Sequence, residues 1–342
     1  MSTSTLRTPA APSLRRGVLT LAWLLPLGVF FVALPWIQEA TGVTWLVSTL
    51  TRFAIYALAA AALNLVMGYG GLVSFGHGAF FGVGGYVVAI LAHHLAEGDA
   101  LLGAASGSAL AVWPLAVLTS GLLGLAIGWL SLRTSGVQFI MITLAFGQLV
   151  FILLVSLEYY GGDDGLLVPQ RSSLPWVSRP SLVHVYYASV GLLALWLLFT
   201  ARLVRSRFGA VLRGLRQSER RIASLGYPAR PYRLVAFAIS AAGMGLAGAL
   251  WAEYARFVSP DMAAWTKSGE FMAMVILGGV GTLAGPVVGA SIYLALEQGF
   301  TVLTERWMLL FGPALVLVVL LGRRGVVGMV ESGMAAWRAR RG

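Results

Sequence analysis

Long apolar runs that lack Asp, Glu, Lys and Arg dominate the pattern of the chain. They cover roughly residues 17–36, 53–72, 74–93, 110–131, 136–157, 183–201, 234–252, 271–296 and 307–322. Most of these runs hold about the 20 residues that a helix needs to cross the hydrocarbon core of a bilayer. The first run follows Arg15 and Arg16 and is too long for the apolar region of a signal peptide, so we expect it to remain as an uncleaved helix.

Composition leads to the same class of protein. Hydrophobic residues make up 58% of the 342 positions and charged residues 11%, against ~25% in soluble domains. A soluble domain has too little interior to bury that much apolar surface. These values exclude a soluble enzyme, a disordered protein and a nucleic-acid-binding domain. They predict an all-α polytopic membrane protein with about nine or ten transmembrane helical elements, some of them discontinuous.

Side chains that usually carry chemistry are scarce. The chain has no cysteine, and its histidines lack the spacing that places two metal ligands on one face of a helix. We therefore expect no metal site, no cofactor and no catalytic residue. The apolar runs contain no Asp, Glu or Lys, whereas a proton- or sodium-coupled carrier usually needs an ionisable group within the membrane.

Arginine clusters set the expected orientation. The net charge is +11, and every basic residue except Lys267 is an arginine. Because cytoplasmic segments are enriched in Lys and Arg, we place on that side an N-terminal tail (1–16), a loop (202–233) and a basic C-terminal tail (323–342), around a transmembrane domain (17–322). Both termini are cytoplasmic only if 271–296 enters and leaves the membrane as two short helices. A single crossing, with the last arginines outside, is the alternative.

Two glycine-rich segments, residues 68–78 and 278–286, interrupt the apolar pattern. Irregular backbone at membrane depth is tolerated where it is buried in protein or lines an aqueous cavity. Paired interruptions in the two halves of a transporter point to its solute pathway. The candidate pathway residues are Asn64, Gly70, Gly71, Ser74, His77, Gln148, Gly278, Gly279 and Thr282. Close packing of helices through glycine, with His77 bonded to backbone, is the alternative interpretation, and the two are compatible.

The loop segment 207–226 carries an apolar stripe at helical spacing. Glycine and prolines at its end predict one or two short amphipathic helices. Such a stripe either docks on a soluble partner or lies on anionic lipid. For docking, we expect Leu215 and Ile222 to be the anchors and Glu219 to meet a basic residue of the partner. The candidate coupling residues are Phe208, Leu212, Leu215, Glu219, Ile222 and Gly226.

Five segments, in order along residues 53–300, resemble one known family. They are Ala62-Leu63-Asn64-Leu65 with residues 68–71 and 74–82, Thr143-Leu144-Ala145-Phe146-Gly147, residues 218–226, Ser259-Pro260-Asp261, and residues 278–286. Together they resemble the permeases of branched-chain amino-acid ABC transporters, and most closely the longer, M-type subunit. The resemblance implies a subunit that translocates branched-chain or related amino acids through a bacterial inner membrane.

The same resemblance implies partners. They are a second homologous permease, two cytoplasmic ATPase subunits and an external or periplasmic solute-binding protein. The ATPases would hydrolyse the ATP, because the only lysine here, Lys267, follows Thr266 rather than the glycine of a phosphate-binding loop. Asp163 stands where family members often have proline, so a permease for urea or short amides is an alternative. A secondary carrier and a membrane-embedded enzyme are the competing classes.

Overall fold

The computed structural model describes residues 45–99, 107–174 and 181–303, together with isolated positions and short stretches outside these ranges. The chain divides into two compact units, residues 1–48 and 49–342. In the first unit, the backbone N–H of Val47 donates to the side chain of Gln38 at 2.9 Å. The predicted tails and the predicted spans 17–36 and 307–322 lie largely outside the described residues.

Helices make up almost all of the described structure, which confirms the predicted all-α membrane class. Among the described helices, six are long and apolar enough to cross a bilayer. They are α2 (Leu46–Asn64, continued by a π-helical turn, Leu65–Tyr69), α3 (His77–Glu97), α4 (Ala109–Ser131), α5 (Val137–Val155), α6 (Leu182–Arg205) and α9 (Ala229–Ala255). Further α-helices are α7 (Arg207–Gln217), α8 (Glu219–Ser224), α10 (Trp265–Gly278) and α11 (Gly285–Leu303).

The spanning helices differ in how deeply they are buried. The apolar windows of α2, α3 and α9 are 61–67% buried, whereas those of α4, α5 and α6 are 17–28% buried. Leu118, Leu149 and Leu198 are exposed on these three outer helices. Exposed leucines are expected where a helix faces lipid rather than water.

Glycine brings the inner helices into backbone contact. A Cβ added to Gly84 of α3 would lie 2.0 Å from the carbonyl oxygen of Gly245 on α9. A Cβ on Gly248 would lie 1.8 Å from the carbonyl oxygen of Phe81. Only glycine fits at these positions, which confirms the close-packing interpretation for the helical glycines.

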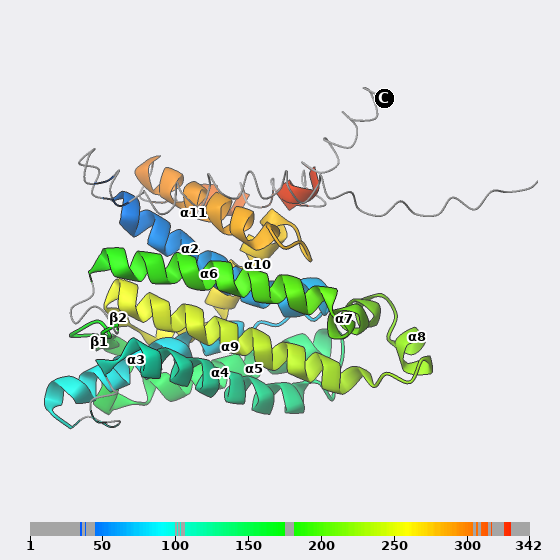
Figure 1. Ribbon diagram of the computed structural model, residues 1–342, viewed down its shortest axis with the longest axis horizontal. Coiled ribbons are helices and arrows are strands. Elements are labelled where there is room, and N and C mark those ends of the chain that lie inside the picture. The colour runs from blue at the N-terminus through cyan, green and yellow to red at the C-terminus, as the bar shows by residue number, and fades with distance from the viewer. Residues whose placement is uncertain are drawn as a thin grey trace, which may run out of the picture. The chain divides into compact units, whose positions relative to one another are not determined.

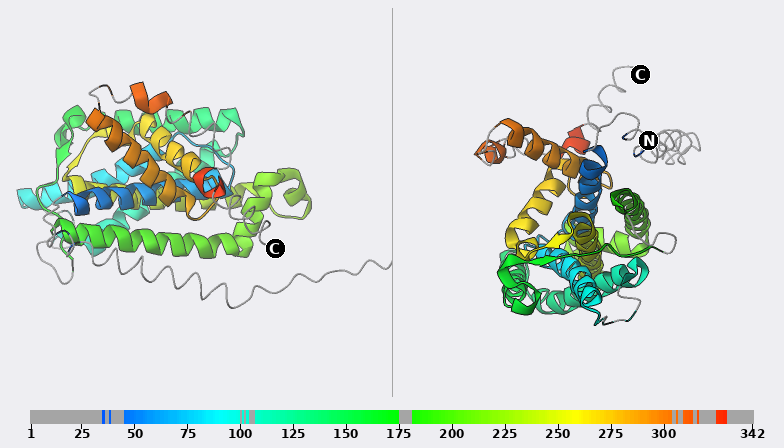
Figure 2. Two further views of the ribbon diagram at one scale, coloured as in Figure 1. Left: turned by 90° about the horizontal axis from the view of Figure 1, so that it is seen from above. Right: turned by 90° about the vertical axis from the view of Figure 1, so that its left-hand side faces the viewer.

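The two ends of the long helices carry different structures (Figure 1). At one end, β1 (Leu166–Leu167) and β2 (Phe257–Val258) pair antiparallel, with Leu166 opposite Val258 and Leu167 opposite Phe257. At the other end lie α7 and α8. We call them the strand end and the arginine-rich end. In the end-on view of Figure 2, α11 lies beside α10 and away from α4.

Short capping motifs define α7 and α8. The Ser206 hydroxyl accepts from the N–H of Gly209 at the start of α7, and Ser218 does the same for Arg221 in α8. Such caps satisfy backbone donors that a helix leaves free. Gly226 follows α8 with a φ of 85°. The prediction of one or two short helices in 207–226 is therefore confirmed.

The long run 271–296 forms two helices, as predicted. α10 ends at Gly278, the chain is irregular over 279–284, and α11 begins at Gly285 and packs against α10. A Cβ on Gly278 would lie 1.7 Å from the carbonyl oxygen of Gly285. The reversal therefore requires small residues at both ends of the turn.

Candidate functional site

Both predicted glycine breaks interrupt helices. α2 ends at Asn64, the π-helical turn runs to Tyr69, and α3 begins only at His77. Gly71 has a φ of 70°, and in the second break Gly279 and Gly281 have φ values of 124° and 81°. Residues with a Cβ adopt such values at a cost. The glycines therefore allow the chain to unwind at these two places.

The two breaks touch each other. A Cβ added to Gly68 would lie 2.6 Å from the backbone nitrogen of Gly281. The buried Asn64 side chain spans the contact, because its Nδ2 donates to the carbonyl of Thr282 and its Oδ1 accepts from the N–H of Gly281, both at 2.9 Å. We call this set of residues (Asn64, Gly68, Gly71, Gly281 and Thr282) the glycine junction.

Arg216 links α7 to both breaks. Its Nη1 donates to the carbonyl oxygen of Gly68. A Cβ on Gly71 would lie 2.9 Å from Cγ of Arg216, and one on Gly281 would lie 2.9 Å from its Nη1. Sequence reasoning missed Arg216, because nothing in the spacing separates it from the other arginines of the loop. The glycine junction thus lies toward the arginine-rich end.

Other candidate pathway residues lie within the breaks and contact the irregular backbone there. The Thr282 hydroxyl donates to the carbonyl of Gly279 at 2.9 Å and accepts from the N–H of Gly285 at 3.0 Å. A Cβ on Gly70 would lie 2.6 Å from the carbonyl oxygen of Val66. Ser74 is buried and accepts from the N–H of Gly76 at 3.4 Å. These groups fix the shape of the irregular backbone.

His77 belongs to the packing of α3 on α9 rather than to the junction. Its Nε2 lies 3.1 Å from the Ser240 hydroxyl, which donates to the carbonyl of Ala62 at 2.7 Å. Because the Ser240 proton is committed to Ala62, Nε2 is the donor in this pair. The ring also stacks edge-on against Phe80 and Phe237. Its partner is a side chain, and the expected bond from His77 to backbone is therefore corrected.

Gln148 lies on α5 beside the first break. A Cβ on the preceding Gly147 would lie 3.0 Å from Cα of Gly76. The Oε1 of Gln148 is buried and has no hydrogen-bond partner among the described residues. The structure does not bring this side chain into the glycine junction.

Two ion pairs flank the predicted apolar runs, in helices that continue past those runs. Arg52 of α2 pairs with Glu297 of α11 at 2.7 Å, and Lys267 pairs with Glu270 within α10 at 2.8 Å. Both α10 and α11 extend beyond the apolar run, so these residues fall inside helices. Pairing cancels the charges, which makes their place in a helix bundle less costly.

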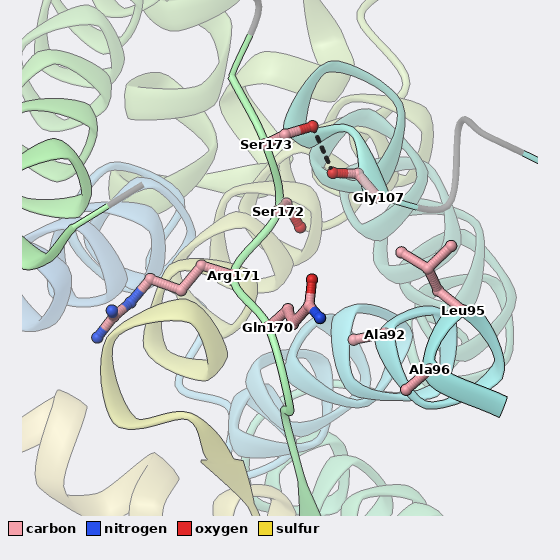
Figure 3. Close-up of a pocket in the computed structure, with 8 residues that line it drawn as sticks. All are labelled: Ala92, Leu95, Ala96, Gly107, Gln170, Arg171, Ser172 and Ser173. Carbon is pink, nitrogen blue, oxygen red and sulfur yellow. Dashed lines mark hydrogen bonds between the residues drawn. The ribbon is translucent and has the colours of Figure 1, made fainter. Parts of the chain in front are cut away.

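At the strand end, a cavity of about 340 Å³ lies between α3, Gly107 just before α4, and the loop that follows β1 (Figure 3). Its lining residues are Ala92, Leu95, Ala96, Gly107, Gln170, Arg171, Ser172 and Ser173. The buried Glu253 of α9 holds the loop, since both its oxygens accept from the N–H of Ser172, at 3.0 and 3.2 Å. Burial, followed by the nearby Arg256, lowers the pKa of Arg171.

The apolar stripe of α7 packs against its own chain. Leu212 and Leu215 are buried, and α7 lies against α6, α9 and the π-helical turn. Phe208 stacks on Tyr232 with ring centres 5.6 Å apart. The expected role of Leu215 as an anchor in a partner is therefore corrected. Glu219 likewise meets a basic residue of this chain, Arg233, at 2.8 Å.

An open groove remains between α7 and α8. It has a volume of about 280 Å³, and we call it the α7–α8 groove. Leu225 and Tyr227, on its rim, are 66% and 44% exposed. The lining residues are Arg207, Ala210, Val211, Ile222, Leu225 and Tyr227. Of the two predicted anchors, Ile222 alone faces this groove.

Comparison with known proteins decides the family. The family model for the permease component of branched-chain amino acid transport systems matches residues 45–321, which include both breaks and α7. The chain belongs to this family. The predicted resemblance to the M-type subunit is confirmed by two relatives named high-affinity branched-chain amino acid transport system permease protein LivM. That of Escherichia coli K12 is 29% identical, and that of Salmonella typhimurium LT2 is 30% identical; each alignment covers 90% of this chain and 75% of the relative.

A third relative comes from an archaeon. The probable branched-chain amino acid transport permease protein LivM of Methanocaldococcus jannaschii is 26% identical over 72% of this chain and 78% of its own length. No solved structure was found to match. In this permease, the candidate site is the pair of glycine breaks, held together by Asn64 and contacted by Arg216.

Proposed function

We propose that this chain is one of two membrane-spanning subunits of an ATP-driven importer, and that its solutes are branched-chain amino acids. The observation that carries the proposal is the contact of Arg216, on α7, with both glycine breaks. A helix outside the membrane thereby touches the two places where the spanning backbone is irregular. Movement of α7 would act directly on the solute pathway.

The energy would come from partner subunits. The sequence holds no glycine-rich loop followed by lysine and a hydroxyl residue, which ATP hydrolysis by a phosphate-binding loop requires. We assign two cytoplasmic ATPase subunits, a second homologous permease and an external or periplasmic solute-binding protein as partners. The α7–α8 groove is the surface that would receive the ATPase.

Orientation follows from the arginines. Those of 202–233 gather at the end that carries α7 and α8 (Figure 1). Because positive residues favour the cytoplasmic side, we place this end in the cytoplasm and the strand end outside the bacterial inner membrane. The strand end then faces the solute-binding protein.

A second candidate is an ion-coupled carrier, and Glu297 is the observation that favours it. Carriers of this kind use ionisable groups inside the membrane. In this chain Glu297 is bound to Arg52 at 2.7 Å. In an ion-coupled cycle, Glu297 would have to separate from Arg52 in order to bind the coupling ion. An ATP-driven importer can keep this ion pair intact throughout its cycle.

Uptake by a strain that lacks this gene tests the proposal. We expect uptake of leucine, isoleucine and valine to fall and to return with the wild-type gene, while urea uptake is unchanged. ATP depletion should stop the restored uptake, and collapse of the proton gradient with ATP maintained should not. Loss of urea uptake alone would select the amide importer, and dependence on the gradient would select the carrier.

A further inference from the structure

A second cavity lies nearer the strand end, among α2, α9, β2 and α10, with a volume of about 190 Å³. Most of its wall is apolar and comes from Tyr56, Phe81, Trp251, Phe257 and Met262. Tyr56 is 8 residues before Asn64 on α2, which places it about 12 Å along that helix from the glycine junction. The cavity therefore lies between the strand end and the junction.

Aromatic side chains give this cavity a firm wall. The ring of Tyr56 lies 5.3 Å from Trp251 and 5.7 Å from Phe271, centre to centre. Phe81 lies 5.2 Å from the same Phe271. Tyr56 and Phe81 are buried. Packed aromatic rings of this kind offer a large apolar surface to an aliphatic side chain.

Opposite charges also line the cavity. Lys267 contributes a cation and Asp261 a carboxylate. The Lys267 ammonium also lies 5.9 Å from the ring centre of Tyr56 and pairs with Glu270 at 2.8 Å. The Lys267 side chain is 27% exposed and lines the cavity, so a ligand in the cavity meets a cation there.

We infer that this cavity, the Tyr56–Lys267 cavity, is a binding site for a zwitterionic amino acid with an aliphatic side chain on its way through the permease. Lys267 binds the carboxylate, Asp261 binds the ammonium group, and the aromatic wall receives the side chain. Ligand sites commonly combine a mostly apolar lining with a few placed polar groups. The larger cavity at Ser172 is a weaker match, because its charged lining residue is Arg171 and it has no carboxylate in its lining.

This assignment rests on the proposed function. It predicts which solute the permease prefers, and that preference can be measured separately from whether uptake occurs at all. The test uses membrane vesicles that contain the assembled importer, with ATP inside and the solute-binding protein outside. Labelled leucine and valine are supplied separately, and the ratio of their uptake rates is measured along with ATPase activity. Ala255 lines the cavity and is exposed, so Ala255→Leu fills space without removing a packed side chain. Ala145→Leu, at an exposed position of α5, is the matched control.

We expect Ala255→Leu to lower the ratio of leucine to valine uptake about tenfold, since one methylene in a fitted pocket changes selectivity by 10- to 200-fold. Lys267→Gln should lower uptake of both solutes about tenfold or more, with the ATPase subunits still bound. The Ala145→Leu ratio should equal that of the wild type. An unchanged ratio in Ala255→Leu together with wild-type uptake in Lys267→Gln overturns the cavity assignment alone. Wild-type vesicles that take up neither solute with ATP overturn the proposed function, and this assignment with it.

Discussion

Arg216→Ala is expected to abolish most solute uptake while leaving the ATPase subunits bound. The guanidinium donates to the carbonyl of Gly68 and fills the space next to Gly71 and Gly281. A hydrogen bond to a charged group contributes about 1.5–3 kcal/mol. Because Arg216 is exposed, the low end of that range applies. Each 1.4 kcal/mol corresponds to about a tenfold change in an equilibrium constant. We therefore expect uptake to fall at least about tenfold.

Two variants make this result specific. Arg205→Ala removes an exposed arginine at the end of the neighbouring α6, and it should keep wild-type uptake. Arg216→Lys keeps the charge but loses the planar fork, so it should restore uptake only in part. ATP hydrolysis that continues in Arg216→Ala without uptake is the signature of uncoupling. Wild-type uptake in Arg216→Ala would show that the contact with the breaks transmits nothing.

Leu225→Ala combined with Tyr227→Ala is expected to release the ATPase from the permease. Both side chains lie on the rim of the α7–α8 groove and are exposed, at 66% and 44%. Truncating a well-buried interface anchor typically costs about 2 kcal/mol or more of binding free energy. Co-purification of the ATPase should therefore fall sharply, and uptake with it. The membrane part should keep its yield, because neither residue belongs to its core.

The matched control is Tyr187→Ala with Leu195→Ala, which removes the same residue types from the outer surface of α6. It should retain both the ATPase and uptake. The lipid-surface interpretation of 207–226 makes the opposite prediction for the groove variant. If the segment lies on lipid, the ATPase stays bound to Leu225→Ala with Tyr227→Ala, and removal of the exposed arginines Arg220 and Arg221 weakens function instead.

Periodicity predicted most of the described helices, because a spanning helix must be apolar over about 20 residues. The two breaks were predictable for a similar reason: Gly71, Gly279 and Gly281 are needed where φ is positive. Contact between the breaks was not predictable from a single sequence, since 217 residues separate Asn64 from Gly281. Periodicity carries no information about which helices become neighbours.

The loop shows a second limit of sequence reasoning. The apolar stripe of 207–226 predicted α7 and α8, but not which surface the stripe would contact. Leu212 and Leu215 pack inside the chain, and the exposed groove forms at Leu225 and Tyr227, outside the strongest periodicity. The apolar pattern placed the charged residues of α2, α10 and α11 outside the predicted runs, because each run ends at the first charged residue. The helices continue past these residues, since each charge has an ion partner. The two-residue strands are too short for any alternating pattern.

Transport by the purified, reconstituted complex tests the central claim most directly. The permease would be assembled with its second permease and ATPase subunits in vesicles that hold ATP inside, with solute-binding protein and labelled leucine outside. We predict that leucine accumulates inside against its gradient only when ATP is present and can be hydrolysed. Accumulation without ATP, driven by an ion gradient alone, would contradict the account.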